Sequence, residues 1–127
     1  MPLTPIASQG EYSDRFLLID TTMATTTLSN VVDGRGLTLV GLELPASATG
    51  GNANIQEMPR FAGGSPITLV KEDGTAITIA HTTSARIYRW SPLLFPAVGK
   101  ITLSLASGTM TAGSTIGFLF IKPQGER

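Results

Sequence analysis

Short runs of alternating apolar and polar residues, separated by turns that contain glycine, follow one another from residue 15 to residue 122. A period of two is typical of half-buried strands, and closely spaced glycine turns indicate an all-β sandwich or barrel. With 127 residues we expect one such domain, at residues 14–127, after an extended N-terminal arm at residues 1–13. The predicted strands are residues 15–21, 25–31, 37–44, 53–57, 67–71, 76–80, 86–90, 100–106 and 115–122.

The stretch ITLVKEDGTAITIAH, residues 67–81, allows the register of one hairpin to be predicted. A two-residue turn would set apolar residues of one strand against polar residues of the other. A three-residue loop at residues 72–74 keeps one face apolar, and it places Gly74 where such loops need a left-handed residue. In that register the apolar pairs are Leu69 with Ile77 and Ile67 with Ile79.

The same stretch contains Lys71, Glu72 and Asp73 close to His81, the only histidine of the chain. We interpret the charges as a solvated hairpin tip, which is a poor place to raise the pKa of a carboxylate. His81 is expected to open a loop, and Ser84 would approach it only if the chain turned there. Because there is no G-x-S-x-G elbow, we expect no catalytic residue and no enzyme.

Composition argues against most ligands and cofactors. The chain has no cysteine, so no thiolate nucleophile is available, and one histidine does not make a zinc site. Asp33-Gly34-Arg35-Gly36 contains G-x-G but lacks the third glycine and the following helix of a dinucleotide site, so it is interpreted as a turn. We expect neither cofactor nor metal, and a loop calcium site built from Asp33, Asp73 and carbonyl groups stays as an open alternative.

Charge and hydropathy limit the partners. Charged residues make up 14% of the chain, and nine basic residues balance nine acidic ones. Nucleic acid is not expected as a partner, because phosphate binding depends on clustered Lys and Arg. The apolar runs are too short for a membrane span, and the N-terminus lacks the basic and apolar regions of a signal peptide. Low charge suits a protein that hides its surface against neighbours.

The last two predicted strands, residues 100–106 and 115–122, are interpreted as a hairpin. The first alternates, so it has one face toward water. Residues 116–121 are apolar on both faces apart from Gly117, which indicates a central strand or a subunit contact. Phe118 and Phe120 are therefore expected to be buried.

Two sets of residues are candidates for contact with partners. The arm is either a frayed terminus or a segment that lies on a neighbouring subunit through Leu3, Ile6 and Tyr12. Tyr88 and Trp90 share one face of a predicted strand. They either pack into the core or form a ligand-binding or partner-binding surface with the neighbouring arginines.

Four segments carry a resemblance to a known family: LELPAS (residues 42–47), DGTAITIAHTTSARIYRWSPLLF (73–95), GKITLSLASGT (99–109) and FIKP (120–123). Their order resembles that of small virion proteins of tailed bacteriophages. The segment NANIQEMPRFAGGSP, residues 52–66, departs from that family, which often has a regular strand and an S-x-D-G turn there.

The resemblance implies a jelly-roll or immunoglobulin-like antiparallel β-sandwich with no catalytic residues to transfer. It implies a virion protein, assembled in the host cytoplasm, that binds the major capsid protein or other virion proteins as a capsid decoration (cement) protein. Identical copies are expected to associate, and a trimer is favoured because shells present three-fold sites. The alternative is a carbohydrate-binding or receptor-binding module of a fibre, with Tyr88 and Trp90 as its platform.

Overall fold

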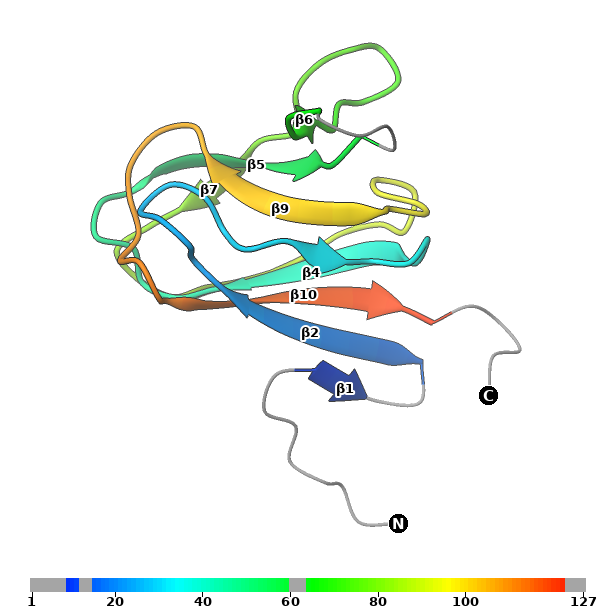
Figure 1. Cartoon of the computed structure of the whole chain (residues 1–127), viewed down its shortest axis with the longest axis horizontal. Coiled ribbons are helices and arrows are strands. Elements are labelled where there is room, and N and C mark those ends of the chain that lie inside the picture. The colour runs from blue at the N-terminus through cyan, green and yellow to red at the C-terminus, as the bar shows by residue number, and fades with distance from the viewer. Residues whose placement is uncertain (1–8, 12–14, 60–63, 123–127) are drawn as a thin grey trace.

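Two antiparallel β-sheets face one another across a hydrophobic core (Figure 1). The computed structural model describes residues 9–11, 15–59 and 64–122. One sheet has the order β1-β2-β10-β4-β8, and the other has the order β3-β9-β5-β6 with β7 also paired to β5. The strands are β1 (Gln9–Glu11), β2 (Phe16–Thr22), β3 (Val32–Asp33), β4 (Thr38–Leu44), β5 (Gly51–Glu57), β6 (Ile67–Thr68), β7 (Ile79–His81), β8 (Arg86–Arg89), β9 (Lys100–Leu105) and β10 (Thr115–Ile121).

The predicted all-β class is confirmed, since these described ranges contain strands and turns and no helix. It follows that no helix within them is long and apolar enough to cross a membrane. The two layers are those expected when strands with one apolar face bury that face against a second sheet.

Four strand pairs are nested along the sequence. β2 pairs with β10, β3 with β9, β4 with β8, and β5 with β7. Successive pairs alternate between the two sheets, so the chain resembles one long hairpin folded over on itself. The first and last long strands therefore lie side by side, although they are far apart in the sequence (Figure 1).

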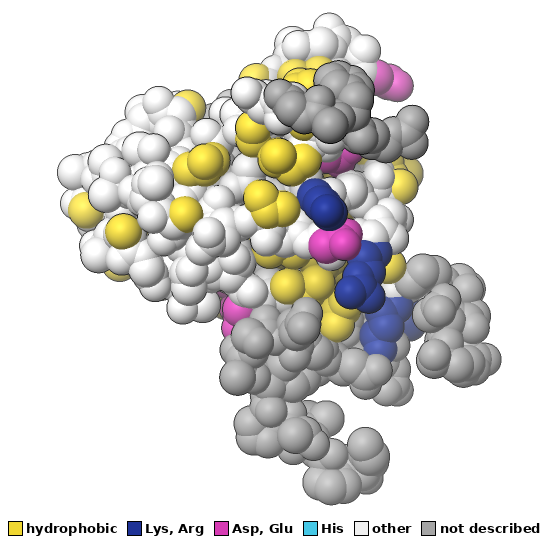
Figure 2. Space-filling model, in the orientation of Figure 1, with side chains coloured by type: hydrophobic (Ala, Val, Ile, Leu, Met, Phe, Trp, Pro, Cys, Tyr) yellow, Lys and Arg dark blue, Asp and Glu magenta, His cyan; other side chains and the backbone are white. Residues whose placement is uncertain are grey.

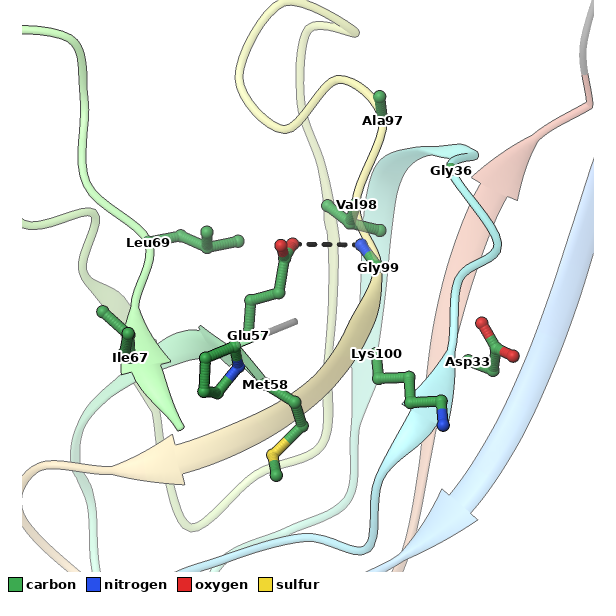
Figure 3. Close-up of a pocket in the computed structure, with 11 residues that line it drawn as sticks. Asp33, Gly36, Glu57, Met58, Ile67, Leu69, Ala97, Val98, Gly99 and Lys100 are labelled. Carbon is green, nitrogen blue, oxygen red and sulfur yellow. Dashed lines mark hydrogen bonds between the residues drawn. The ribbon is translucent and has the colours of Figure 1, made fainter. Parts of the chain in front are cut away.

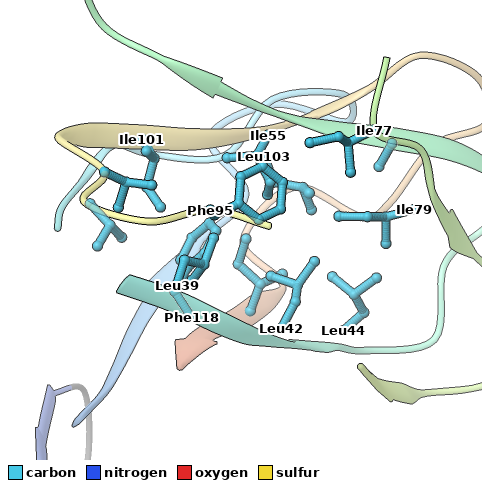
Figure 4. Packing of buried hydrophobic residues seen from close by; sticks show 14 of the residues in the cluster. Leu39, Leu42, Leu44, Ile55, Ile77, Ile79, Phe95, Ile101, Leu103 and Phe118 are labelled. Carbon is cyan, nitrogen blue, oxygen red and sulfur yellow. The ribbon is translucent and has the colours of Figure 1, made fainter. Parts of the chain in front are cut away.

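The core lies between the inner faces of both sheets (Figure 4). β10 lies between β2 and β4, which confirms the predicted central position of the last apolar strand. Phe118 and Phe120 have no exposed surface, so their predicted burial is also confirmed. Both belong to the core cluster, and Figure 4 shows Phe118 on the side opposite Ile55, Ile101 and Leu103 of the other sheet.

The predicted hairpin between the last two strands is wrong. β9 lies in one sheet and β10 in the other, so the segment between them passes from one sheet to the other and does not form a hairpin turn. Both strands bury a face in the same core, and the pattern of apolar residues indicates which residues are buried. The pattern does not indicate which strand lies beside each of them, so a hairpin and a connection between two sheets have the same sequence pattern.

The strand predicted at residues 25–31 does not form. The Oγ1 atom of Thr25 accepts the backbone N–H groups of Thr27 and Leu28, which holds a local turn. Short polar side chains that bind nearby backbone compete in this way with strand pairing. Only isolated bridges at Leu28 and Ser29 remain, followed by the two-residue strand β3.

The hairpin tip has the predicted register. The N–H of Gly74 donates to the carbonyl of Lys71 at 2.8 Å, and the N–H of Lys71 donates to the carbonyl of Thr75 at 2.9 Å. Val70 bridges Ala76, which is the register of the predicted Leu69–Ile77 pair. Gly74 has a φ of 88°, the left-handed conformation predicted for it.

Farther from the tip the predicted pairing of Ile67 with Ile79 is wrong. β6 and β7 both pair with β5 instead, at different positions along it. Ile79 is buried, whereas Ile67 is 57% exposed. The long strand β5 offers more backbone hydrogen bonds than the short hairpin does, so the hairpin arms separate to reach it.

Part of the predicted arm belongs to a sheet. Gln9–Glu11 form β1, which is antiparallel to β2 with Gly10 opposite Leu18. We expected no pairing from residues 1–13, because they show no apolar alternation. An edge strand is held by backbone hydrogen bonds and can form without it. Leu3, Ile6 and Tyr12 lie outside the described residues, so their proposed contacts stay a prediction.

On the outer face of the first sheet the Asp20 carboxylate and the Glu43 side chain lie close to a glycine. A Cβ placed on Gly117 would lie 3.0 Å from Oδ1 of Asp20 and 3.6 Å from Cβ of Glu43. Asp20 is thus partly desolvated over the bare backbone of the central strand. Burial raises the pKa of Asp20 above its ordinary value of 3.8, and the neighbouring Glu43 carboxylate raises it further.

Asp20→Asn is expected to remove a small pH-dependent penalty. The folded state holds the Asp20 proton more tightly than the unfolded chain does, so the free energy of unfolding falls as pH rises through that window. The penalty is absent below the ordinary pKa and complete at neutral pH. We expect the melting temperature of Asp20→Asn to exceed that of the parent by about 1–2 °C at neutral pH, and to match it in acid. A difference that does not vary with pH in thermal melts would contradict this account.

Candidate binding groove

An open groove of about 870 Å³ lies at one end of the sandwich, where β5 ends and β9 begins (Figure 3). β6 and the segment that follows it form one wall, and the loop before β9 forms the other. The lining residues are Asp33, Gly36, Glu57, Met58, Pro59, Ile67, Leu69, Ala97, Val98, Gly99 and Lys100. The groove therefore combines an apolar wall with two carboxylates and one ammonium group.

A tight turn forms part of the rim. The N–H of Leu37 donates to the carbonyl of Gly34 at 2.8 Å, and Arg35 and Gly36 have φ values of 53° and 76°. Two successive positive φ angles define a type I′ turn. Oδ1 of Asp33 accepts the N–H of Arg35 at 3.0 Å and holds the turn from outside. The turn predicted here is confirmed.

A second loop is joined to this turn by backbone hydrogen bonds. The N–H of Gly36 donates to the carbonyl of Val98 at 2.7 Å, and the N–H of Gly34 donates to the carbonyl of Gly99 at 2.8 Å. Ala97, next to these contacts, has a φ of 55°. A non-glycine residue in the left-handed region is strained, and such strain occurs often at binding sites.

Ala97→Gly is expected to stabilise the protein, because glycine adopts a positive φ without steric cost. Allowing for the greater freedom of glycine in the unfolded chain, we expect a gain of roughly 0.5–1 kcal/mol in urea denaturation. Ala112→Gly is the matched control, since Ala112 is an exposed turn residue without a positive φ, and it should be neutral or destabilising. Equal effects of the two substitutions would show that Ala97 is not strained.

Glu57 is the acidic residue most firmly placed in the groove. It is the last residue of β5, and its Oε1 accepts the N–H of Gly99 at 3.0 Å (Figure 3). One oxygen of the carboxylate is thereby fixed to backbone on the far side of the groove. Asp33 and Lys100 are direct neighbours across β3 and β9. These groups can accept and donate hydrogen bonds to a polar ligand.

The polar side chains that line the groove are the carboxylates of Asp33 and Glu57 and the ammonium group of Lys100. The described lining of the groove includes no serine, threonine, cysteine, tyrosine or histidine. The described part of the chain contains no cluster of three or more His, Cys, Asp or Glu side chains that could hold a metal ion. On the face seen in Figure 2, Lys and Arg side chains gather toward one end of the sandwich, while the opposite end is mostly uncharged. The arrangement suits binding.

Tyr88 and Trp90 are packed against the core instead of standing free. The hydroxyl of Tyr88 donates to the carbonyl of Ala80 at 2.5 Å, and Nε1 of Trp90 donates to the carbonyl of Leu39 at 2.7 Å. The Trp90 ring also meets Phe95 edge to face, with 5.5 Å between ring centroids. The core-packing interpretation fits these contacts, because the polar atoms of both rings already have partners within the chain.

The sequence predicted that His81 opens a loop. Instead it is the last residue of β7, and its side chain is 1% exposed. Its Nδ1 is 3.0 Å from Oγ of Ser47, and its Nε2 is 2.7 Å from the carbonyl oxygen of Ser107. A carbonyl only accepts, so Nε2 carries a proton. Oγ of Ser47 is also 2.5 Å from the carbonyl of Thr82. The pair is buried, and the Ser47 hydroxyl links the imidazole to the Thr82 carbonyl, so we interpret it as a structural clasp.

The hairpin tip holds its charges in water, as predicted. Asp73 is exposed, and its Oδ1 accepts the hydroxyl of Thr75 at 2.7 Å and the N–H of Thr75 at 2.9 Å. These bonds lower the pKa of Asp73 below its ordinary value of 3.8, with a smaller contribution from Lys71. Asp33 lines the groove and Asp73 does not, which leaves the open calcium alternative without support.

Sequence reasoning did not identify Glu57 or Lys100 as site residues. Each lies at the end of a strand, and the two strands pair so that Glu57 is opposite Ile101, next to Lys100. A signal existed in Glu57 itself, since it ends an alternating run directly before Met58-Pro59. That signal marks a strand end and says nothing of what lies opposite.

Comparison of the chain with protein-family models, with curated proteins and with solved structures found no match.

Proposed function

We propose that the chain is a non-enzymatic structural protein of a tailed-bacteriophage virion, a capsid decoration protein that binds and stabilises the head shell. The order of the strands is the observation that carries this proposal. Eight strands can be numbered one to eight in chain order: β2, β3, β4, β5, β7, β8, β9 and β10. One sheet then has the order 1-8-3-6 and the other has the order 2-7-4-5. That order is expected of a jelly roll, which we propose as the type of this sandwich.

The jelly roll supports a virion role because viral capsid domains use it widely, as do lectins. Fold alone does not determine function, so the resemblance of the four sequence segments to phage virion proteins is needed as well. The low charge of the chain and the core-packed aromatic residues are compatible with a subunit that works through interfaces. We further propose that copies form a trimer, with Leu3, Ile6 and Tyr12 of the arm on the neighbouring subunit.

The test is the location and copy number of the chain in purified particles of the phage that encodes it. A decoration protein is expected in hundreds of copies on the head, which quantitative mass spectrometry and electron microscopy would detect. Removing it should lower the temperature at which heads release their DNA. A chain found in small numbers at a fibre or tail tip, or absent from particles, would contradict the proposal.

The groove favours a second candidate function, a carbohydrate-binding or receptor-binding module. A groove with fixed carboxylates beside an apolar wall is suited to sugar hydroxyl groups and sugar faces. Glycan-array screening of the parent and of Glu57→Ala distinguishes this role, because binding that depends on Glu57 would place the ligand in the groove. Absence of any glycan binding by the parent leaves the decoration role as the better account.

A further inference from the structure

β8 is an open edge of the five-stranded sheet. It pairs with β4 on one side and is the last strand of the sheet order on the other. The N–H of Trp90 donates to the carbonyl of Val40, its direct partner in the register of β4 and β8. Because antiparallel pairing alternates, Tyr88 and Arg86 also face β4, whereas the backbone groups of Ile87 and Arg89 face away from it.

Two of the features that usually block pairing with another chain are absent from this edge. β8 contains no proline and no register shift against β4. Ile87 is 65% exposed, and Leu93, in the turn after the strand, is 87% exposed. Natural sheets normally protect such an edge with a bulge, a proline, a covering segment or charged side chains, and of these β8 has the charged side chains of Arg86 and Arg89. An exposed edge beside exposed apolar side chains suits the addition of a strand from a partner.

The charges of β8 indicate the chemistry of that partner. Arg86 and Arg89 lie at the two ends of the strand and are exposed. Arg89 has Glu43 at 3.9 Å, and within the described residues Arg86 has no carboxylate at ion-pair distance. A second copy of β8 would bring four arginines together, and like charges across a strand pair are destabilising. A partner strand with carboxylates matches the edge better.

We propose that β8 binds an extended acidic segment of a partner protein as an added antiparallel strand. Alternation along the strand places Ile87 and Arg89 on the outer face and Arg86 on the other. The partner segment would then carry acidic residues three positions apart, opposite Arg89 and Arg86, with an apolar residue between them opposite Ile87. The inference rests on the proposed function, because the partner that carries the acidic segment is taken to be a protein of the head shell.

The experiment is an NMR titration of the full chain with the acetylated peptide Thr-Thr-Glu-Thr-Val-Glu-Thr-Thr, with a matched peptide carrying Lys in place of both Glu residues. We expect the acidic peptide to bind at least about fivefold more tightly, and more weakly as salt is raised. Hydrogen exchange of the Ile87 and Arg89 amides should slow, while that of Tyr88, already bonded to β4, should not change. Equal binding of the two peptides, no binding, or protection elsewhere would overturn the proposal.

Ile87→Pro is the diagnostic variant, because it removes an N–H that faces the free edge and leaves the bonds to β4 in place. Ile87→Thr keeps the N–H and is its matched control. With both variants folded by thermal melt, Ile87→Pro should lose peptide binding by about tenfold or more, and Ile87→Thr should largely retain it. Arg89→Glu should reverse the preference between the two peptides. Should Ile87→Pro fail to fold, the amide protection pattern of the parent decides the question.

Two further measurements separate the other outcomes. Concentration-dependent sedimentation of the parent that disappears in Ile87→Pro would identify a second copy as the occupant and overturn the acidic segment. Binding to purified heads that survives both Ile87→Pro and Arg89→Glu would overturn this inference and leave the decoration function standing. A parent that binds the acidic peptide through β8 but never binds heads would support the inference and contradict the decoration function.

Discussion

Phe118→Ala is expected to lower the free energy of unfolding by about 3–5 kcal/mol. Phe118 lies on the central strand β10, has no exposed surface and faces the opposite sheet across the middle of the core. Truncation would leave a cavity that the core cannot easily close, because hydrogen bonds to β2 and β4 hold β10 in place on both sides. Urea denaturation followed by intrinsic fluorescence or circular dichroism measures the change.

Leu93→Ala is the matched control for Phe118→Ala. Leu93 is a large apolar residue that is 87% exposed, so its truncation should change the free energy of unfolding by less than about 0.5 kcal/mol. A cost at Phe118 as small as that at Leu93 would mean that β10 does not occupy the centre of its sheet.

His81→Ala is expected to be the second most damaging substitution, at roughly 2–5 kcal/mol. The change empties a buried site and removes the hydrogen bonds of the imidazole to the Ser107 carbonyl and to Oγ of Ser47, which keeps the Thr82 carbonyl as its remaining partner. The cost combines the cavity left by the ring with the loss of two hydrogen bonds. The sequence predicted a loop position for His81, and an exposed loop residue would make the same substitution nearly neutral.

The consequence of His81→Ala should be local as well as global. Ser47 follows β4, and Ser107 follows β9, so His81 joins three connections at the end of the sandwich opposite the groove. Hydrogen exchange should increase at the amides of Ser107, which donates to the Asn52 carbonyl, and of Asn52, which donates to Oγ of Ser107, because the ring holds the Ser107 carbonyl. Ser84→Ala, an exposed neighbour in sequence, should change neither stability nor exchange. A neutral His81→Ala would show that the clasp does not exist.

The sequence by itself determined most of the long strands and the local turns. The apolar run at residues 116–121 predicted that Phe118 and Phe120 are buried, and glycine placement predicted the turns at Gly74 and Gly36. These features depend on a residue and its near neighbours, because a strand needs one apolar face and a tight turn needs a positive φ. Local information is therefore sufficient for them.

Only the tertiary structure decided which strands are neighbours and what the strand ends bring together. β9 and β10 follow one another across a turn that contains glycine, as the strands of a hairpin do, yet they lie in different sheets. β6 and β7 both pair with β5 and not with each other. Glu57 binds Gly99, and His81 binds Ser47 and Ser107. These residues are far apart in the sequence, and apolar alternation does not predict such contacts. The physical reason is that backbone hydrogen bonds between strands are the same for any pair of sequences. Partner choice depends on how all the apolar faces can be buried at once, which is a property of the whole chain.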